Sequence, residues 1–250
     1  MEIRILLTGT KRGFFSHVFQ VVTHYSLNDG NLYYPYFVDS LYSNIPDHNM
    51  WLYYFEEPFK IDQSSSYVAS DWFTEYNIPQ NISNDYCIKI NDIMKKHIIL
   101  KPEIKNMFNN IKNRMPSEYL SVHKRGTDHD LHGIKLGIED YFNEIDMVVD
   151  AYEYIYLATD EENTVVKFKN RYGNRLIYND FIRSEDDTNA IHFSKGLENP
   201  YRMGLEVLMD SLILSNSSEM LCTWSGVSQY AILNNPNLKY KRIDPNIIYK

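Results

Sequence analysis

Apolar and polar positions near the start of the chain follow the pattern of a strand, a turn, a helix and a second strand. Residues 3–7 form a short apolar run, and residues 8–13 form a polar turn that contains glycine. From 14 to about 27, apolar side chains recur at helical spacing on one side. A further apolar run at 33–38 ends at Asp39. The pattern therefore predicts a βα unit followed by a second strand.

The next part of the chain lacks a clear period. Residues 44–86 are rich in proline, asparagine, serine and aromatic side chains, so we expect mainly loops here, around the aromatic run 51–55. Helical spacing returns at about 89–114. We expect this helical stretch to break near Pro102, because proline lacks an amide hydrogen and clashes with the preceding turn.

Regular alternation begins after Pro116. Strand-like and helical patterns alternate along this part of the chain, which indicates a parallel, doubly wound sheet. We therefore predict an α/β fold with one domain at 1–115 and a second at 116–250. The strand-like runs are 119–123, 154–158, 175–178, 220–224 and 240–243, and the helical patterns are about 139–150, 161–172, 202–216 and 226–234.

Ligands of such a sheet bind outside the carboxyl ends of its strands. The segments that follow the predicted strands are therefore the first candidates for a binding site. They are 124–130, 159–162, 179–184 and 225–226.

Composition narrows the classes of partner. The chain has 250 residues, 44% of them apolar, a net charge of −8 and a pI near 5.5. An acidic chain does not suit nucleic acid or an anionic membrane surface, both of which need a basic face. No apolar run has the length of a membrane span, and Cys87 and Cys222 form no C-x-x-C motif. We expect a cytoplasmic protein with reduced thiols.

The first candidate site is the sequence HKRGTDH at 123–129. A strand here delivers His123, Lys124 and Arg125 into a turn that contains Gly126. The planar guanidinium of arginine suits two phosphate oxygens, and glycine lets backbone amides approach closely. Asp128 is placed to orient Arg125 or to hold the turn. The alternative is a surface loop whose charges are only solvated.

The second candidate follows the next strand of this half, at ATDEE, 158–162. Thr159 and Asp160 are placed to contact a nucleotide. Helix capping alone accounts for Glu161 and Glu162, because acidic residues stabilise a helix N-terminus.

The third candidate joins a helix that carries Asp210 to the segment LCTWSG at 221–226. Thr223, Ser225 and Gly226 stand where a strand ends and another helix begins, and a helix N-terminus with serine and glycine binds anions. Asp210 lies on a mainly apolar helix, so its carboxylate needs a partner such as a ribose or a backbone amide. The alternative is a helix cap with an exposed aspartate.

These motifs, in this order, resemble the fucosyltransferase superfamily over about 118–235. Its first motif, H-x-R-R-x-D-K, is similar to 123–129, with Gly126 in place of the second arginine and His129 in place of the lysine. The stretch 138–142 and the strand end 156–160 are similar to the next elements of the family. The segment 210–225 resembles its last motif, D-x-x-x-L-S followed by C-T-[aromatic]-S.

The resemblance implies a GT-B-like fold of two facing Rossmann-like domains, with the acceptor side in 1–115 and the nucleotide-sugar donor in 116–250. It implies an inverting transferase that needs no metal or other cofactor. Arg125 would contact the β-phosphate, and Asp210, Thr223, Ser225 and Gly226 would line the nucleoside and phosphate site. We expect the donor to be GDP-fucose, as the resemblance implies, or a UDP-sugar such as UDP-xylose, and the acceptor to be a glycan or glycoconjugate.

Sugar transfer also needs a second clamp and a base. Arg183, after the 175–178 strand, is a candidate second clamp on the diphosphate. Asp39, Asp130 and His132 are rival candidates for the base that deprotonates the acceptor hydroxyl. An acceptor-side loop is expected at three residues of the first turn and helix, Gly13, Phe14 and Ser16.

Other interpretations stay open at this point. Residues 128–130 spell D-x-D, the manganese signature of another transferase fold. A catalytically silent module that binds a sugar or a nucleotide-sugar would share the same shape. A doubly wound dinucleotide enzyme is disfavoured, because no G-x-G-x-x-G follows a strand.

Overall fold

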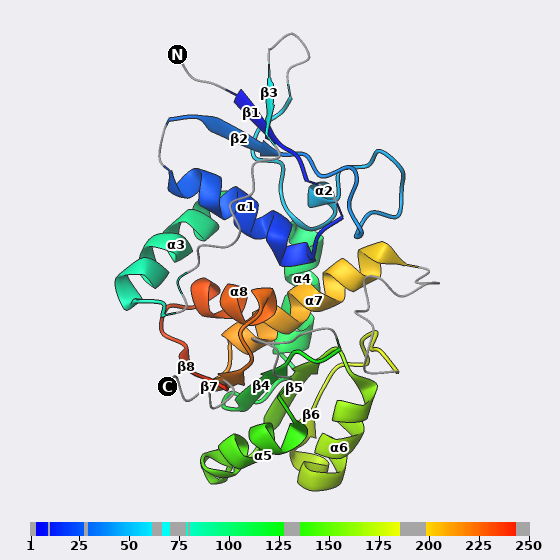
Figure 1. The fold of residues 1–250 in the computed structure, drawn as a ribbon, viewed down its shortest axis with the longest axis vertical. Helices are drawn as coiled ribbons and strands as arrows, with labels where there is room; N and C mark the ends of the chain where they lie inside the picture. The colour runs from blue at the N-terminus through cyan, green and yellow to red at the C-terminus, as the bar shows by residue number, and fades with distance from the viewer. Residues whose placement is uncertain are drawn as a thin grey trace, which may run out of the picture. The chain divides into compact units, whose positions relative to one another are not determined.

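The computed structural model describes residues 4–9, 11–27, 30–61, 67–70, 79, 81–127, 136–185 and 199–243 (Figure 1). The chain divides into two units. The first consists of Met1–Ile111 with Glu198–Val207, and the second of Lys112–Leu197 with Leu208–Lys250. The acceptor and donor roles given to the two halves of the sequence stay predictions.

A parallel three-stranded sheet lies in the first unit, with the strand order β2-β1-β3. The strands are Arg4–Leu7 (β1), Leu32–Pro35 (β2) and Val68–Ser70 (β3). Helix α1, Phe14–Ser26, follows β1 as the sequence predicts and contacts β2. Strand β3 is a finding of the structure. Its residues lie at a sheet edge and are mostly exposed, so they lack the apolar pattern that marks a buried strand.

Three further helices follow along the chain of this unit: α2 (Trp51–Tyr54), α3 (Asn84–His97) and α4 (Pro102–Lys112). Helix α3 begins earlier than predicted, because Ser83 caps it by accepting a hydrogen bond from Tyr86 N at 3.2 Å. The predicted break at Pro102 is confirmed. Proline is the first residue of α4, where the missing amide hydrogen costs nothing.

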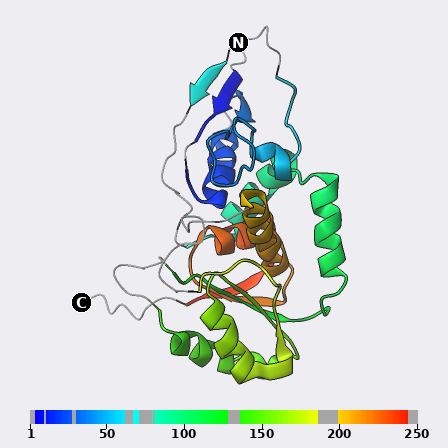
Figure 2. The ribbon, with the colours of Figure 1, turned by 90° about the vertical axis from the view of Figure 1, so that its right-hand side faces the viewer.

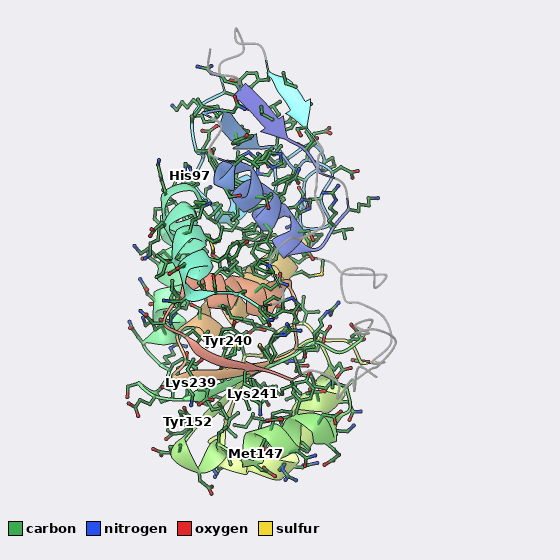
Figure 3. All side chains as sticks on the ribbon, turned by 60° about the vertical axis from the view of Figure 1, so that its left-hand side comes forward. His97, Met147, Tyr152, Lys239, Tyr240 and Lys241 are labelled. Atoms are coloured by element: carbon green, nitrogen blue, oxygen red, sulfur yellow. The ribbon has the colours of Figure 1, made fainter. Side chains whose placement is uncertain are left out.

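A parallel five-stranded sheet forms the centre of the second unit, in the order β6-β5-β4-β7-β8. The strands are Leu120–Lys124 (β4), Ile155–Thr159 (β5), Leu176–Ile177 (β6), Glu219–Cys222 (β7) and Lys239–Arg242 (β8). Each matches a predicted strand to within about two residues at either end. Strand β8 is an edge of this sheet and displays lysine side chains (Figure 3).

Helices cover both faces of this sheet (Figures 1 and 2). On one face, α5 (Ile138–Asp146) and α6 (Glu162–Tyr172) enclose an apolar core that includes Val122. On the other face lie the second half of α7 (Pro200–Ser215) and α8 (Gly226–Asn234). The predicted α/β architecture with parallel sheets is therefore confirmed. Short 3-10 turns at Val149–Ala151 and Gly173–Arg175 follow α5 and α6.

Helix length and hydropathy bear on membrane association. Across the described residues, every helix is too short or too polar to cross a lipid bilayer.

Candidate functional site

The strand order reverses direction at β4, which has β5 on one side and β7 on the other. Such a switch point is where ligands bind in a doubly wound sheet. Arg125 directly follows β4 and Thr223 directly follows β7. Their segments are joined, because Arg125 N donates to Thr223 Oγ1 at 3.4 Å and Thr223 N donates to the carbonyl of His123 at 3.0 Å. Two predicted candidate segments thus meet at the switch point.

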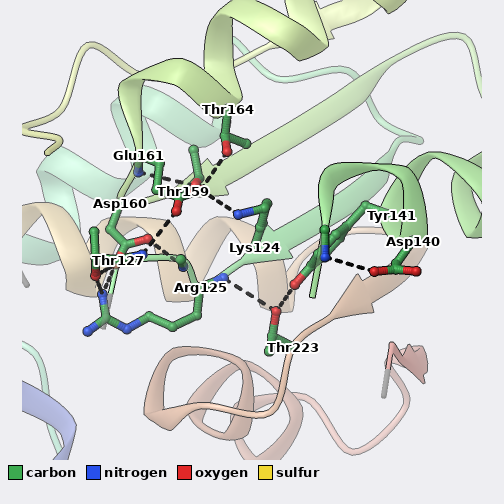
Figure 4. Close-up of polar contacts among 12 residues, drawn as sticks. Lys124, Arg125, Thr127, Asp140, Tyr141, Thr159, Asp160, Glu161, Thr164 and Thr223 are labelled. Atoms are coloured by element: carbon green, nitrogen blue, oxygen red, sulfur yellow. Dashed lines mark hydrogen bonds and ion pairs between the residues drawn. The ribbon is translucent and has the colours of Figure 1, made fainter. Parts of the chain in front are cut away.

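Arg125 is partly exposed, with 20% of its side chain accessible. Its guanidinium forms an ion pair with the carboxylate of Asp160, across the ends of β4 and β5 (Figure 4). Arg125 Nη1 also donates to Thr127 Oγ1 at 3.1 Å. The side chain is therefore oriented at the carboxyl edge of the sheet while it stays accessible to solvent.

Asp160 organises the turn that follows β4. In addition to pairing with Arg125, its carboxylate accepts hydrogen bonds from Gly126 N at 2.8 Å and from Thr127 Oγ1 at 2.9 Å. A single carboxylate thus fixes three groups of the turn. The sequence assigned the orienting of Arg125 to Asp128, which lies outside the described residues. A contact of Asp160 with a nucleotide stays a prediction.

A buried ion pair supports this turn from below. Lys124 and Glu161 pair with side chains that are each only 5% exposed. The Glu161 carboxylate also accepts from Thr127 N at 3.0 Å and from Thr164 Oγ1 at 2.7 Å. Burial alone would raise the pKa of Glu161, but the hydrogen bonds from Lys124 and Thr164 outweigh it and lower that pKa.

The expectation that Glu161 serves to cap its helix is wrong. Glu161 stands at the N-cap position of α6, but its side chain makes no capping hydrogen bond to that helix. The carboxylate points instead to the turn after β4, where Lys124 and the amide of Thr127 bind it. The reason is electrostatic, because a buried lysine needs a carboxylate more than an exposed helix end does.

Gly126 is required by the close approach of Glu161. A Cβ at position 126 would lie 1.9 Å from Glu161 Cδ and 2.0 Å from Glu161 Oε1. Thr127, the next residue, has a φ of 40°, in the left-handed region that side chains rarely adopt. The turn therefore has a tightly fixed backbone.

Two threonines of the candidate list are part of the framework of the site. Thr223 is 2% exposed and shares a short hydrogen bond with the hydroxyl of Tyr141. Burial raises the pKa of Tyr141, so this hydroxyl is neutral. Thr159 is 8% exposed, and its Oγ1 accepts from Glu161 N at 3.3 Å. Both threonines hold strand ends in place.

Asp210 has a protein partner that the sequence did not reveal. The hydroxyl of Tyr156, a residue of β5, donates to Asp210 Oδ1 at 2.5 Å. Asn179 Nδ2 in turn donates to the same hydroxyl at 2.8 Å. This tyrosine is neutral, since burial raises the pKa of Tyr156, and it gives the Asp210 carboxylate a hydrogen-bond donor. A contact of Asp210 with a ribose stays a prediction.

Ser225 and Gly226 begin α8, as predicted. Ser225 N donates to Ser228 Oγ at 3.0 Å, and Ser228 Oγ donates to the carbonyl of Thr223 at 2.7 Å. This network fixes the first turn of α8 to the end of β7. His123 is a residue of β4 and is 4% exposed, so it is buried within the strand, one residue before its carboxyl end. Donor contacts of these residues stay predictions.

Arg183 holds its own loop. Its side chain is 4% exposed and donates to the carbonyls of Asn179 at 2.5 Å and Phe181 at 3.2 Å. The carboxylate of Glu162 lies 3.6 Å away. A role of Arg183 as a clamp on a diphosphate would require it to leave these contacts, and that role stays a prediction.

The candidate residues of the first unit lie around the start of α1 and after β2. Gly13 is the N-cap of α1, and its carbonyl accepts from Ser16 N at 3.0 Å. Phe14 is 2% exposed and packs edge-on against Tyr54, so it belongs to the core. Asp39 is exposed and lies beyond β2, which ends at Pro35 rather than at the predicted residue 38.

Some predictions concern residues outside the described part of the chain. These are Asp128, Asp130 and His132, and with them the D-x-D triplet at 128–130. Within the described ranges, no three His, Cys, Asp or Glu side chains are grouped in a way that could hold a metal ion.

Sequence reasoning missed the supporting roles of three residues, Lys124, Tyr141 and Tyr156. All three are buried side chains that hold candidate residues or the turn after β4. A signal for Lys124 was present, because a lysine within an apolar strand requires a buried counter-charge and an acidic residue ends the neighbouring strand. The two tyrosines carried no such signal among the many in this chain.

Solved structures of fucosyltransferases share this fold. The Se-Met form of the fucosyltransferase NodZ from Bradyrhizobium matches with a TM-score of 0.63 and 14% identity, over 98% of this chain and 97% of that one. NodZ alpha-1,6-fucosyltransferase co-crystallized with GDP matches with a TM-score of 0.60 and 13% identity, over 94% and 93%. POFUT1 in complex with GDP has a TM-score of 0.51 and 9% identity, over 96% and 97%.

At the level of sequence alone, no protein-family model and no curated protein matches the chain. The likeness is therefore one of fold. The chain has the GT-B-like α/β fold of the fucosyltransferases NodZ and POFUT1.

Proposed function

We propose that this protein is a glycosyltransferase that takes its sugar from a nucleoside-diphosphate sugar, with GDP-fucose as the first candidate donor. The observation that carries the proposal is the position of Arg125. Its guanidinium stands at the carboxyl ends of β4 and β5, beside the switch point of the sheet, where it is oriented by Asp160 and still accessible. That is the place and the chemistry for a diphosphate.

The ion pair between Arg125 and Asp160 can be exchanged for a diphosphate when the donor binds and re-formed when the diphosphate leaves. In the free protein the Asp160 carboxylate binds the Arg125 guanidinium, as an anionic ligand would. A diphosphate offers the same bidentate acceptor geometry with more charge, so it competes for Arg125 when the donor binds. Positive charge at this point stabilises the diphosphate as the bond to the sugar breaks. The first turn of α8 adds amide dipoles directed at the same edge.

The transfer proposed is inverting and independent of metal. An inverting transfer needs one base to deprotonate the acceptor hydroxyl. Asp39, Asp130 and His132 remain the candidates. Asp39 is exposed, as a residue that must meet an acceptor has to be.

GDP is favoured over UDP because NodZ, a structure of the same fold, was co-crystallized with GDP and soaked with GDP-fucose. A UDP-sugar such as UDP-xylose is the second candidate.

The test is a thermal-shift panel of GDP, UDP, ADP and dTDP, followed by turnover of GDP-fucose. A ligand at one hundred times its Kd adds about 2.7 kcal/mol to the free energy of unfolding. Stabilisation by GDP alone supports the proposal, and the absence of any stabilisation contradicts it.

A module that binds nucleotide-sugars without turnover is the second candidate function. One observation favours it: Glu161 fills the space that a side chain at position 126 would need, where the family motif has a second arginine. The two functions differ in one measurement. Release of fucose or its transfer to an acceptor, at a rate that depends on protein concentration, excludes the silent module.

A further inference from the structure

Strand β8 brings one more cation to the carboxyl edge of the second sheet. Arg242 is the last residue of β8 and lies in register with Cys222 of β7, which is in register with His123 of β4. The hydrogen bond from Ile243 N to the carbonyl of Cys222, at 2.9 Å, maintains this register to the end of the strand. Arg242 therefore stands at the same edge as Arg125, on the other side of the switch point.

The basic residues of β8 divide between the two faces of the sheet. Lys241 pairs with Glu144 of α5, and Lys239 pairs with Glu219 at 2.6 Å. Both lysines therefore serve the face that α5 covers. Successive side chains of a strand point to opposite faces, so Arg242 projects to the face of α7 and α8.

The guanidinium of Arg242 lies over the ring of Trp224, 4.4 Å from the ring centroid. Trp224 is the second residue after the end of β7 and directly precedes Ser225, the N-cap residue of α8. A guanidinium stacked on an indole uses its face for the ring and keeps its N–H groups directed sideways, in its own plane. The stack thus places this guanidinium beside the start of α8.

We propose that Arg242, positioned by Trp224, is a second guanidinium that binds the diphosphate of the nucleotide donor. The inference rests on the proposed function and adds a residue to it. The cations of β4 are each matched by a carboxylate of the next strand end, Arg125 by Asp160 and Lys124 by Glu161. A diphosphate carries more than one negative charge, and Arg242 adds a guanidinium to that of Arg125, from the α8 side of the same edge.

The test compares Arg242→Gln with Lys241→Gln. Both variants remove one positive charge from the same strand, but Lys241 is exposed, lies on the opposite face, and forms a surface ion pair of little energetic weight. The Kd values of GDP and of guanosine are measured for each by calorimetry. If the panel above selects UDP, then UDP and uridine take their place.

A contact with the phosphates has a distinct signature. Arg242→Gln should weaken binding of the diphosphate at least tenfold and leave binding of the nucleoside within about twofold, while Lys241→Gln changes neither. Arg242→Lys, which keeps the charge and the strand edge, should fall between the wild type and Arg242→Gln. Trp224→Leu should reproduce part of the loss, because it removes the surface that orients the guanidinium.

The outcomes separate the inference from the proposed function. If Arg242→Gln and Arg242→Lys bind the diphosphate as the wild type does, Arg242 is not a ligand, and the proposed function stands. If diphosphate and nucleoside weaken together, Arg242 has only a structural role and the inference is overturned. A wild-type protein that binds no nucleoside diphosphate overturns both.

Discussion

Gly126 and Glu161 approach each other so closely that a Cβ on the glycine would fall 1.9 Å from the Glu161 carboxyl carbon. The contact joins the turn after β4 to the end of β5. Because the Glu161 carboxylate is itself held by the buried Lys124, it cannot give way cheaply. The shape of the turn that carries Arg125 is therefore set by an ion pair beneath it.

Gly126→Ala is predicted to displace this turn. The added Cβ forces Glu161 or the turn to move, so we expect GDP affinity to fall at least tenfold and the Tm to drop by several degrees. Gly137→Ala is the matched control, since a Cβ there meets only Asp140 Oδ2, at 3.5 Å. Calorimetry and thermal unfolding measure both. Equal GDP affinities for the two variants would show that the turn does not form the site.

Arg125→Lys is predicted to lose donor binding although the charge is kept. Lysine is a point charge and cannot reproduce the two parallel hydrogen bonds of the guanidinium fork. We expect kcat/KM for GDP-fucose to fall at least a hundredfold. The stability without ligand should change little, since the side chain is partly exposed and lysine keeps the charge that faces Asp160. Arg171→Lys, at an exposed ion pair with Asp146, is the control. Near-normal turnover in Arg125→Lys would remove Arg125 from the mechanism.

Breaking the buried ion pair is predicted to destabilise the second unit. Lys124→Met leaves the Glu161 charge uncompensated, which costs about 3–5 kcal/mol in buried pairs. The double variant Lys124→Met with Glu161→Gln should recover part of the loss, because no buried charge remains. Urea unfolding measures each free energy. A double variant less stable than Lys124→Met would contradict this account.

His17 is predicted to cause a loss of stability in acid. It is fully buried in α1, and burial, followed by the nearby charge of Arg12, lowers its pKa to about 3. The unfolded chain, with a histidine pKa near 6.5, binds the proton more readily. His17 therefore leaves stability intact above about pH 6.5 and reduces it by about 1.4 kcal/mol per pH unit as the pH falls toward 3.

The measurement is the slope of unfolding free energy against pH between 6.5 and 4. His17→Leu should flatten this slope, because it removes the buried imidazole. An unchanged slope in His17→Leu would mean that another group titrates.

The sheet of the second unit could be predicted from the sequence because its three central strands are buried apolar runs and helical patterns alternate with the strands. The residues after its strands could be predicted as well, since topology alone places Arg125 and Thr223 at one edge. Strand β3 could not, because its side chains are mostly exposed at a sheet edge. Pairings such as Tyr156 with Asp210 join residues far apart in the chain and follow from packing alone.

Position 126 illustrates the same limit within a motif. The sequence shows glycine where the family motif has arginine, which reads as a lost phosphate ligand. The structure adds that the Glu161 carboxylate occupies the space that a side chain at position 126 would need. The glycine at 126 is therefore required by the glutamate that follows β5. That relation depends on the side chains of two strands and is not visible in either segment alone.

The central claim is that Arg125 binds the diphosphate of the donor, and a crystal structure of the protein with GDP tests it most directly. We expect the β-phosphate within hydrogen-bond distance of the Arg125 guanidinium, at the carboxyl ends of β4 and β7. A diphosphate bound elsewhere, with Arg125 still paired to Asp160 alone, would contradict it.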